Sequence, residues 1–180
     1  ELFWDDAAGG LWLSGTHNET LIAKTKELYD GALPSGNSVA ALTLTKLSLL
    51  TMDQGLRQKA EELFRTFSGQ VSQMPSGFPQ FLIALDVWLG PSQEIVIAGD
   101  LQASSTHQMI RLAQKRFLPR AVMAVHPTDE AAAAIEALAP FLKTQRPLQG
   151  KTTAYVCQDY ICRLPETDPE AFAASLDALP

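Results

Sequence analysis

Two carboxylates near the start of the chain have the residue type and spacing that acid–base chemistry could use. Glu27 and Asp30 lie three positions apart in a segment without regular periodicity, just before the turn-forming residues 34–37. Paired carboxylates cleave glycosidic bonds, where one protonates the leaving group and the other activates water or attacks the sugar. Two acids in one loop also occur by chance, so the pair alone is a signal of low specificity.

Ser35 lies in the same stretch and carries a hydroxyl group that could act as a nucleophile. Neither a G-x-S-x-G motif nor a partner histidine accompanies it, so the sequence excludes a serine nucleophile of the hydrolase type. A helix that begins here needs a side chain to accept its free N–H groups. The sequence therefore favours Ser35 or Ser38 as a helix N-cap.

The three histidines do not form a metal-binding pattern. His17, His107 and His126 stand apart, without an H-E-x-x-H or H-x-H motif, so we expect no metal and no cofactor. His126 and the pair Gly99-Asp100 each follow a predicted buried strand, at the edge where open α/β sheets bind ligands. No glycine-rich nucleotide motif accompanies them, so we interpret these residues as ordinary strand ends.

Cys157 and Cys162 flank a predicted tight turn with C-x4-C spacing. A disulfide needs Cα atoms within about 7 Å. A four-residue loop would place the two cysteines opposite each other. A two-residue turn would instead pair Gln158 with Ile161, and with that turn we expect the cysteines not to be paired directly. The sequence leaves the bridge open and favours two small buried residues over redox or metal chemistry.

Composition excludes several classes of function. The 180-residue chain has a net charge of −6 and a pI near 5.0, which argues against nucleic-acid binding. No apolar run approaches the roughly 20 residues that span a bilayer, and no secretory signal pattern is present. Two cysteines without a signal favour a cytoplasmic setting. The start at Glu1, with no initiator Met, indicates a piece of a longer protein.

The first half of the chain is predicted to be helical. Gly9 and Gly10 predict a β-hairpin or paired extended arms over residues 2–15, followed by an irregular segment. Helices are expected over residues 38–51, 56–71 and 77–89, joined as antiparallel hairpins. The first of these helices is apolar on more than one side, which predicts a buried helix. Its apolar residues are Val39, Leu42, Leu47, Leu49 and Leu50.

After Gly90 the pattern alternates between strands and helices. Strands are expected over residues 94–100 and 121–127, helices from Ser105 and over residues 129–142, a hairpin over 153–165, and a last helix with Thr167 as N-cap. Ser105 and Gln108 read as a capping box. The fold class is therefore α+β, with helical hairpins in residues 1–90 and a small α/β layer, a βαβ unit plus a hairpin, in residues 91–180.

Three stretches together resemble one family of long proteins. Residues 26–42 (KELYDGALPSGNSVAAL), 94–100 (EIVIAGD) and 154–172 (AYVCQDYICRLPETDPEAF) are similar to the C-terminal end of the spermatogenesis-associated, thioredoxin-domain-containing proteins. The resemblance implies a thioredoxin-like domain elsewhere in the parent chain, followed by an (α/α)6 barrel of the six-hairpin glycosidase type. The helices of this chain would then be the closing hairpins of that barrel.

The resemblance also implies a function. In six-hairpin proteins the sugar site lies in loops at the barrel mouth, so Glu27 and Asp30 become the acid candidates and Ser35 and Asn37 line the cleft of a carbohydrate-binding or carbohydrate-processing site. The alternative is a non-catalytic scaffold that docks a partner or the thioredoxin-like domain through the face near Asp100 and His126. Closing hairpins without the rest of the barrel expose apolar surface, so we also expect self-association or a rearranged helical layer.

Overall fold

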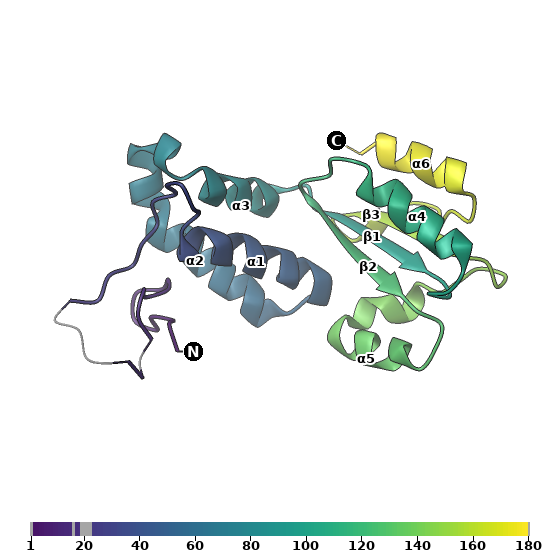
Figure 1. Ribbon diagram of the computed structural model, residues 1–180, viewed down its shortest axis with the longest axis horizontal. Coiled ribbons are helices and arrows are strands. Elements are labelled where there is room, and N and C mark those ends of the chain that lie inside the picture. The colour runs from purple at the N-terminus through teal and green to yellow at the C-terminus, as the bar shows by residue number, and fades with distance from the viewer. Residues whose placement is uncertain (1, 16, 19–22, 180) are drawn as a thin grey trace. The chain divides into compact units, whose positions relative to one another are not determined.

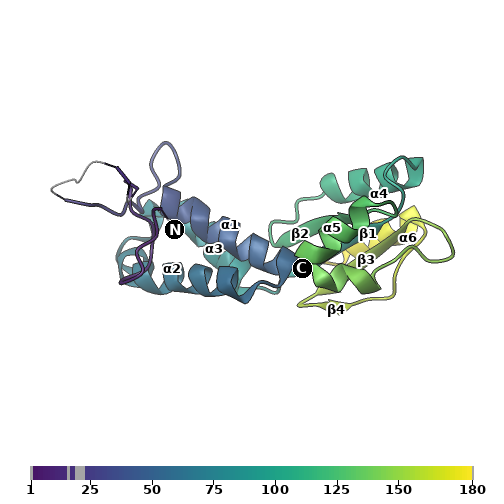
Figure 2. The same ribbon diagram turned by 90° about the horizontal axis from the view of Figure 1, so that it is seen from below.

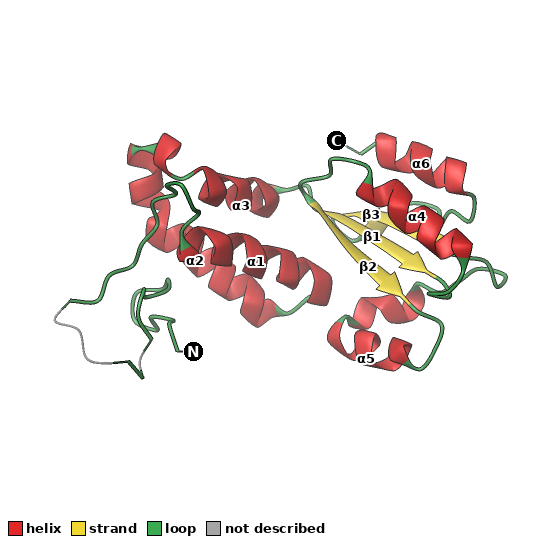
Figure 3. Ribbon diagram, in the orientation of Figure 1, coloured by secondary structure: helices red, strands yellow, loops and turns green. Residues whose placement is uncertain are grey.

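The computed structural model describes residues 2–15, 17–18 and 23–179 and has the predicted α+β fold (Figure 3). Part of the predicted irregular segment, residues 16 and 19–22, lies outside the described residues. The chain divides into two compact units. Unit 1 comprises Glu1–Ser48 and Asp53–Leu89, and unit 2 comprises Leu49–Met52 and Gly90–Pro180.

Unit 1 is built from three helices that lie side by side (Figures 1 and 2). They are α1 (Gly36–Thr51), α2 (Gln54–Gln73) and α3 (Pro79–Leu89), with the short 3-10 helix η1 (Pro75–Gly77) before α3. The carboxylate of Asp53 accepts hydrogen bonds from the N–H groups of Gly55 and Leu56 and so starts α2. The predicted apolar stripe of α2 faces the core.

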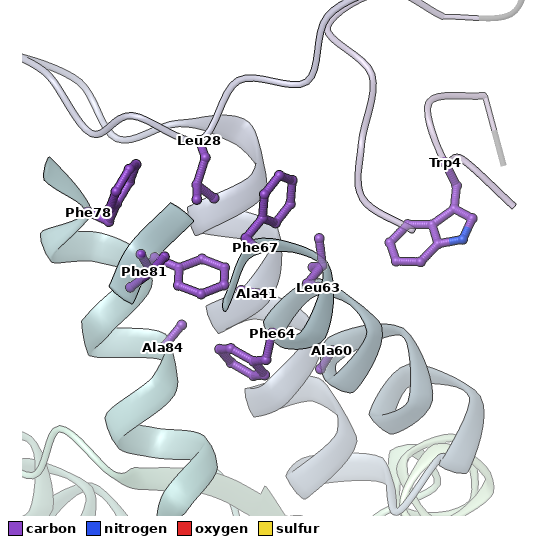
Figure 4. Close-up of a cluster of buried hydrophobic side chains, with 11 residues drawn as sticks. Trp4, Leu28, Ala41, Ala60, Leu63, Phe64, Phe67, Phe78, Phe81 and Ala84 are labelled. Carbon is purple, nitrogen blue, oxygen red and sulfur yellow. The ribbon is translucent and has the colours of Figure 1, made fainter. Parts of the chain in front are cut away.

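Aromatic side chains dominate the core of unit 1 (Figure 4). Phe81 packs against both Phe64 and Phe67 in edge-to-face geometry, with ring centroids 5.3 and 6.1 Å apart. The N-terminal segment adds Trp4, which lies in paired extended arms as predicted. An antiparallel bridge joins Trp4 to Leu11.

Helix α1 differs from the prediction that its large apolar residues are buried. Of those residues only Leu49 is buried, whereas Val39 is 45% exposed and Leu47 is 40% exposed. The buried side of the part of α1 in unit 1 instead carries small residues: Asn37, Ser38, Ala41, Thr45 and Ser48. Thr45 donates to the carbonyl of Ala41 and Ser48 to that of Thr45. Because the helix itself satisfies these two hydroxyls, this part of the face can be buried at little cost.

Unit 2 contains a four-stranded mixed sheet in the order β2-β1-β3-β4. Its strands are β1 (Gln93–Ala98), β2 (Ala121–His126), β3 (Thr153–Gln158) and β4 (Ile161–Cys162). Strand β1 pairs parallel with β2 and antiparallel with β3, and β3 pairs antiparallel with β4. The predicted βαβ unit and hairpin are both present.

Helices cover both faces of this sheet, so β1 is buried along its whole length (Figure 1). Ile95 and Ile97 face a core formed with α4 (Ser104–Gln114) and α6 (Pro169–Asp177). Val96 and Ala98 face the opposite core, which includes Leu142 of the 3-10 helix η2 (Pro140–Thr144). Helix α5 (Ala131–Leu138) precedes η2.

Three predicted helix signals are wrong in detail. The N-cap of α4 is Ala103, which has no capping side chain. The Ser105 hydroxyl bonds to Thr152 and does not form the predicted capping box. Asp168, one residue later than predicted, caps α6 by accepting from the N–H of Ala171. The expected helix over residues 129–142 ends at Leu138, since Pro140 cannot donate the next backbone hydrogen bond.

Two phenylalanines of unit 2 provide a matched test of this packing. Phe172 is fully buried in the core beside α4, whereas Phe117 is 92% exposed. We expect Phe172→Ala to lower the free energy of unfolding by about 3–5 kcal/mol and Phe117→Ala by less than about 0.5 kcal/mol. Urea denaturation of the two variants measures the difference, and equal losses would contradict the assigned core.

Candidate functional site

Asp30 is held by backbone hydrogen bonds and lies in the interior of unit 1. It is 8% exposed, and its carboxylate accepts from the N–H groups of Ser35, Gln80 and Phe81 at 2.9, 2.9 and 3.2 Å. Gln80 and Phe81 belong to the first turn of α3, whose free N–H groups need an acceptor. The carboxylate predicted to be catalytic thus closes the loop before α1 and caps α3.

Ser35 and Asn37 also have identifiable structural roles. The Ser35 hydroxyl accepts from the N–H of Ser38, as the sequence predicts for an N-cap of α1. The Asn37 amide bonds to both backbone groups of Leu11 and donates to the carbonyl of Glu27, at 2.7–3.0 Å. Asn37 therefore joins the N-terminal arm, the loop and α1.

Glu27 is exposed, and it lines a hollow of about 260 Å³ together with Asn37, Phe3 and Trp12. Leu11, Leu13 and Gly36 complete the lining. The structure thus brings Glu27 and Asn37 to one hollow, while Asp30 and Ser35 are not part of it. Phe3 and Trp12 were not predicted, because they lie on an arm more than ten residues away in sequence.

Lys26 fixes the arm that carries Trp12. Its ammonium bonds to the Asp5 carboxylate and to the carbonyl of Gly9, each at 2.5 Å, and lies 4.5 Å from the centre of the Trp12 ring. The hydrogen bond from Lys26, followed by one from the N–H of Ala7, holds the pKa of Asp5 below its ordinary value. These contacts order one wall of the hollow.

A second hollow, of about 530 Å³, lies in unit 2 at the carboxyl ends of β1 and β2. Gly99, Asp100 and Thr128 line it, as do Ser105 and Lys151. Sequence reasoning identified Gly99 and Asp100 at this edge but missed Ser105 and Lys151, which come from separate elements.

His126 does not line this hollow, and its side chain is fully buried. Its Nδ1 bonds to the carbonyl of Gln145 at 2.7 Å, and its Nε2 to the carboxylate of Glu136 at 2.9 Å. Glu136 also accepts from Arg146 at 2.6 Å. These bonds tie the end of β2 to α5 and to the chain after η2, so His126 has a structural role here.

Cys157 and Cys162 form a disulfide, so the expectation of two small buried residues is wrong. The turn consists of Asp159 and Tyr160, both with positive φ. Gln158 pairs with Ile161, and the next pair outward joins the two cysteines. The prediction that a two-residue turn does not pair the cysteines is therefore wrong, because this turn places them opposite each other.

Other kinds of site are absent from the part of the chain that the structure describes. Within residues 2–15, 17–18 and 23–179, no group of three or more His, Cys, Asp or Glu side chains could hold a metal ion. None of the helices in these ranges is long and apolar enough to cross a membrane.

Comparison with known proteins gives a consistent result. The chain is 34% identical over 170 residues to spermatogenesis-associated protein 20 of Homo sapiens, 32% identical to that of Rattus norvegicus and 30% to that of Mus musculus. Each match covers 94% of this chain. The chain is homologous to a segment of spermatogenesis-associated protein 20. It spans only 22% of the length of the human protein. No family model matches the chain, and no solved structure matches it significantly.

The two predicted acids should separate clearly in a stability measurement. Asp30→Ala leaves three backbone donors without their acceptor, so we expect a loss of about 2–3 kcal/mol in the free energy of unfolding. Glu27→Ala, at an exposed position, should change it by less than about 0.5 kcal/mol. Thermal and urea unfolding test this, and an unaffected Asp30→Ala variant would refute the capping role.

Proposed function

We propose that unit 1 contributes one wall of a carbohydrate-binding cleft in a longer parent protein. The observation that carries the proposal is the hollow that Phe3, Trp12 and Glu27 line together. Aromatic faces pack against the C–H groups of a sugar ring, and a carboxylate accepts hydrogen bonds from its hydroxyls. No other described residue is seen to bond to the Glu27 carboxylate, so it is available to a ligand.

The hollow supports binding more strongly than hydrolysis. The oxygens of Asp30 already accept three backbone hydrogen bonds, and Asp30 does not line the hollow with Glu27. Asn37 contributes to the wall, but its amide is already bonded to Leu11 and Glu27. A catalytic pair of Glu27 and Asp30, with Ser35 as a ligand contact, therefore has no geometric support in this segment.

The size of the hollow fits a partial site. Its volume of about 260 Å³ is just below the ~300–1,000 Å³ typical of complete small-molecule pockets. The remainder of the parent chain would supply the opposite wall. An (α/α)6 barrel of the six-hairpin type, with a thioredoxin-like domain elsewhere, is part of the same proposal and rests on the family resemblance. A cytoplasmic location is also proposed, and it rests on the two cysteines and the lack of a signal pattern in the sequence.

Titration with simple sugars tests the proposal. We expect Glu27→Gln and Trp12→Ala in the parent protein each to weaken the binding of a monosaccharide that the parent protein binds by about tenfold. Each change removes one contact between the wall of the hollow and the sugar. Calorimetric titration with glucose, mannose and N-acetylglucosamine measures this. Glu130→Gln and Phe117→Ala, both exposed in unit 2, are the matched controls. Unchanged affinity in both wall variants would refute the proposal.

A second candidate function is protein interaction, and the exposed side of α1 favours it. A largely apolar hollow of about 370 Å³ is lined by Trp4, Leu11, Val39 and Leu44, with Lys59 at its border. Val39 is 45% exposed here, since the inner face of α1 is made of small residues. We propose a second copy of this chain as the partner, in line with the predicted self-association.

Light scattering tests the interaction directly. We expect the isolated chain to associate at high concentration, and Val39→Glu to shift it toward the monomer, because a charge would enter the apolar hollow. Leu33→Glu, at an exposed position outside the hollow, should leave association unchanged. A monomeric chain at all concentrations would rule out this candidate.

A further inference from the structure

The Cys157–Cys162 disulfide lies at an accessible edge of the sheet. Strand β4 is the outermost strand, and Cys162 is exposed, whereas Cys157 is only 2% exposed. Ile161, the neighbour of Cys162, is 78% exposed. A dissolved thiol can therefore reach the sulfur of Cys162, while that of Cys157 stays in the interior.

Gln145 places a polar group against both sulfurs. Its side-chain Nε2 lies 3.7 Å from Sγ of Cys157 and 3.5 Å from Sγ of Cys162, within the range of hydrogen bonds to sulfur. Gln145 is itself 7% exposed. An N–H donor in this position stabilises the negative charge that develops on a departing thiolate.

The other half of the Gln145 amide has no partner in the disulfide form. Its Oε1 is buried and accepts no hydrogen bond from any residue within the described ranges. A disulfide has no S–H group to offer, whereas two thiols do. If the amide turns over, Oε1 can accept from a thiol, so reduction satisfies an acceptor that oxidation leaves unsatisfied.

The hairpin does not depend on the disulfide to stay in place. Backbone bonds join Arg163 to Val156, and Glu166 to Ala154 in both directions. The turn is held separately: the carboxylate of Asp159 accepts from the N–H of Ser92. The covalent loop contains only the residues between positions 157 and 162, and short loops restrict the unfolded chain least. Opening the bridge therefore leaves unit 2 folded.

We propose that Cys157 and Cys162 form a reversible redox site that exchanges with low-molecular-weight thiols. An incoming thiolate attacks Sγ of Cys162 and forms a mixed disulfide; the S–S bond breaks, and its electron pair goes to Cys157, which leaves as a thiolate beside Gln145 and takes a proton from water. A second thiolate attacks the outer sulfur of the mixed disulfide and releases Cys162. In total, two thiols are oxidised to one disulfide and the protein pair gains two electrons and two protons.

Equilibration of the purified chain with glutathione tests the proposal. In buffers of varied reduced-to-oxidised glutathione ratio, we expect mass spectrometry after thiol alkylation to show full, reversible reduction, with an unchanged far-ultraviolet circular dichroism spectrum. Gln145→Leu should lower the equilibrium constant for reduction about 3- to 10-fold, because the acceptor for the thiols is lost. Gln102→Leu, at an exposed position remote from the sulfurs in sequence, is the control and should have no effect.

Single-cysteine variants provide a second measurement that does not depend on Gln145→Leu folding. In the folded protein, we expect the Cys162 thiol of Cys157→Ser to react with oxidised glutathione at least about tenfold faster than the Cys157 thiol of Cys162→Ser, because only Cys162 is exposed. Reduction that occurs only when the chain unfolds, or equal rates for the two thiols, would overturn the proposal. An equilibrium constant unaffected by Gln145→Leu would overturn the role of Gln145.

Discussion

Three backbone N–H groups meet at the buried carboxylate of Asp30, and the arrangement of unit 1 depends on this one acceptor. The carboxylate ties the loop that leads into α1 to the first turn of α3, two segments about 50 residues apart in sequence. A buried acid is costly unless its oxygens are satisfied, and here donors from helix starts satisfy them. Asn37 extends the same principle to the N-terminal arm, since its amide binds the backbone of Leu11. Asn37 also lines the hollow with Glu27, so its bonds to Leu11 and Glu27 hold parts of that lining together.

The local signals in the sequence predicted the elements well. The stripe of α2 and the β-branched run of β1 each identify one element, because their spacing matches the period of a helix or the burial of a strand. The N-cap role of Ser35 could be predicted for the same reason, since it depends on residues within one turn. The distinction between Ser105 and Ala103 at the start of α4 could not be predicted. It depends on Thr152, which comes from a distant part of the chain.

Side-chain partners across long sequence distances account for most of what the sequence did not reveal about the candidate site. Nothing near Asp30 in the sequence indicates that Gln80 and Phe81 supply its donors, so its capping role could not be predicted. Phe3 and Trp12 lie on an arm that Lys26 and Asn37 hold from distant positions in the sequence. The cysteine pair is different, because the length of the turn fixes which residues of the two strands lie opposite each other. Once Gln158 pairs with Ile161, Cys157 and Cys162 are the next pair along the two strands.

The buried face of α1 has a consequence for how this helix responds to its surroundings. The hydroxyls of Thr45 and Ser48 take their hydrogen bonds from the helix itself, so they need no partner from the rest of unit 1. Such a face loses little free energy when it is exposed to water, and the opposite face, with Val39, gains when it is covered. The rotation of α1 about its own axis is therefore specified by Asn37, whose amide bonds to Leu11 and Glu27, and by the apolar contacts of the helix. The hydroxyls of Thr45 and Ser48 add nothing to that preference, although they lie on the buried side.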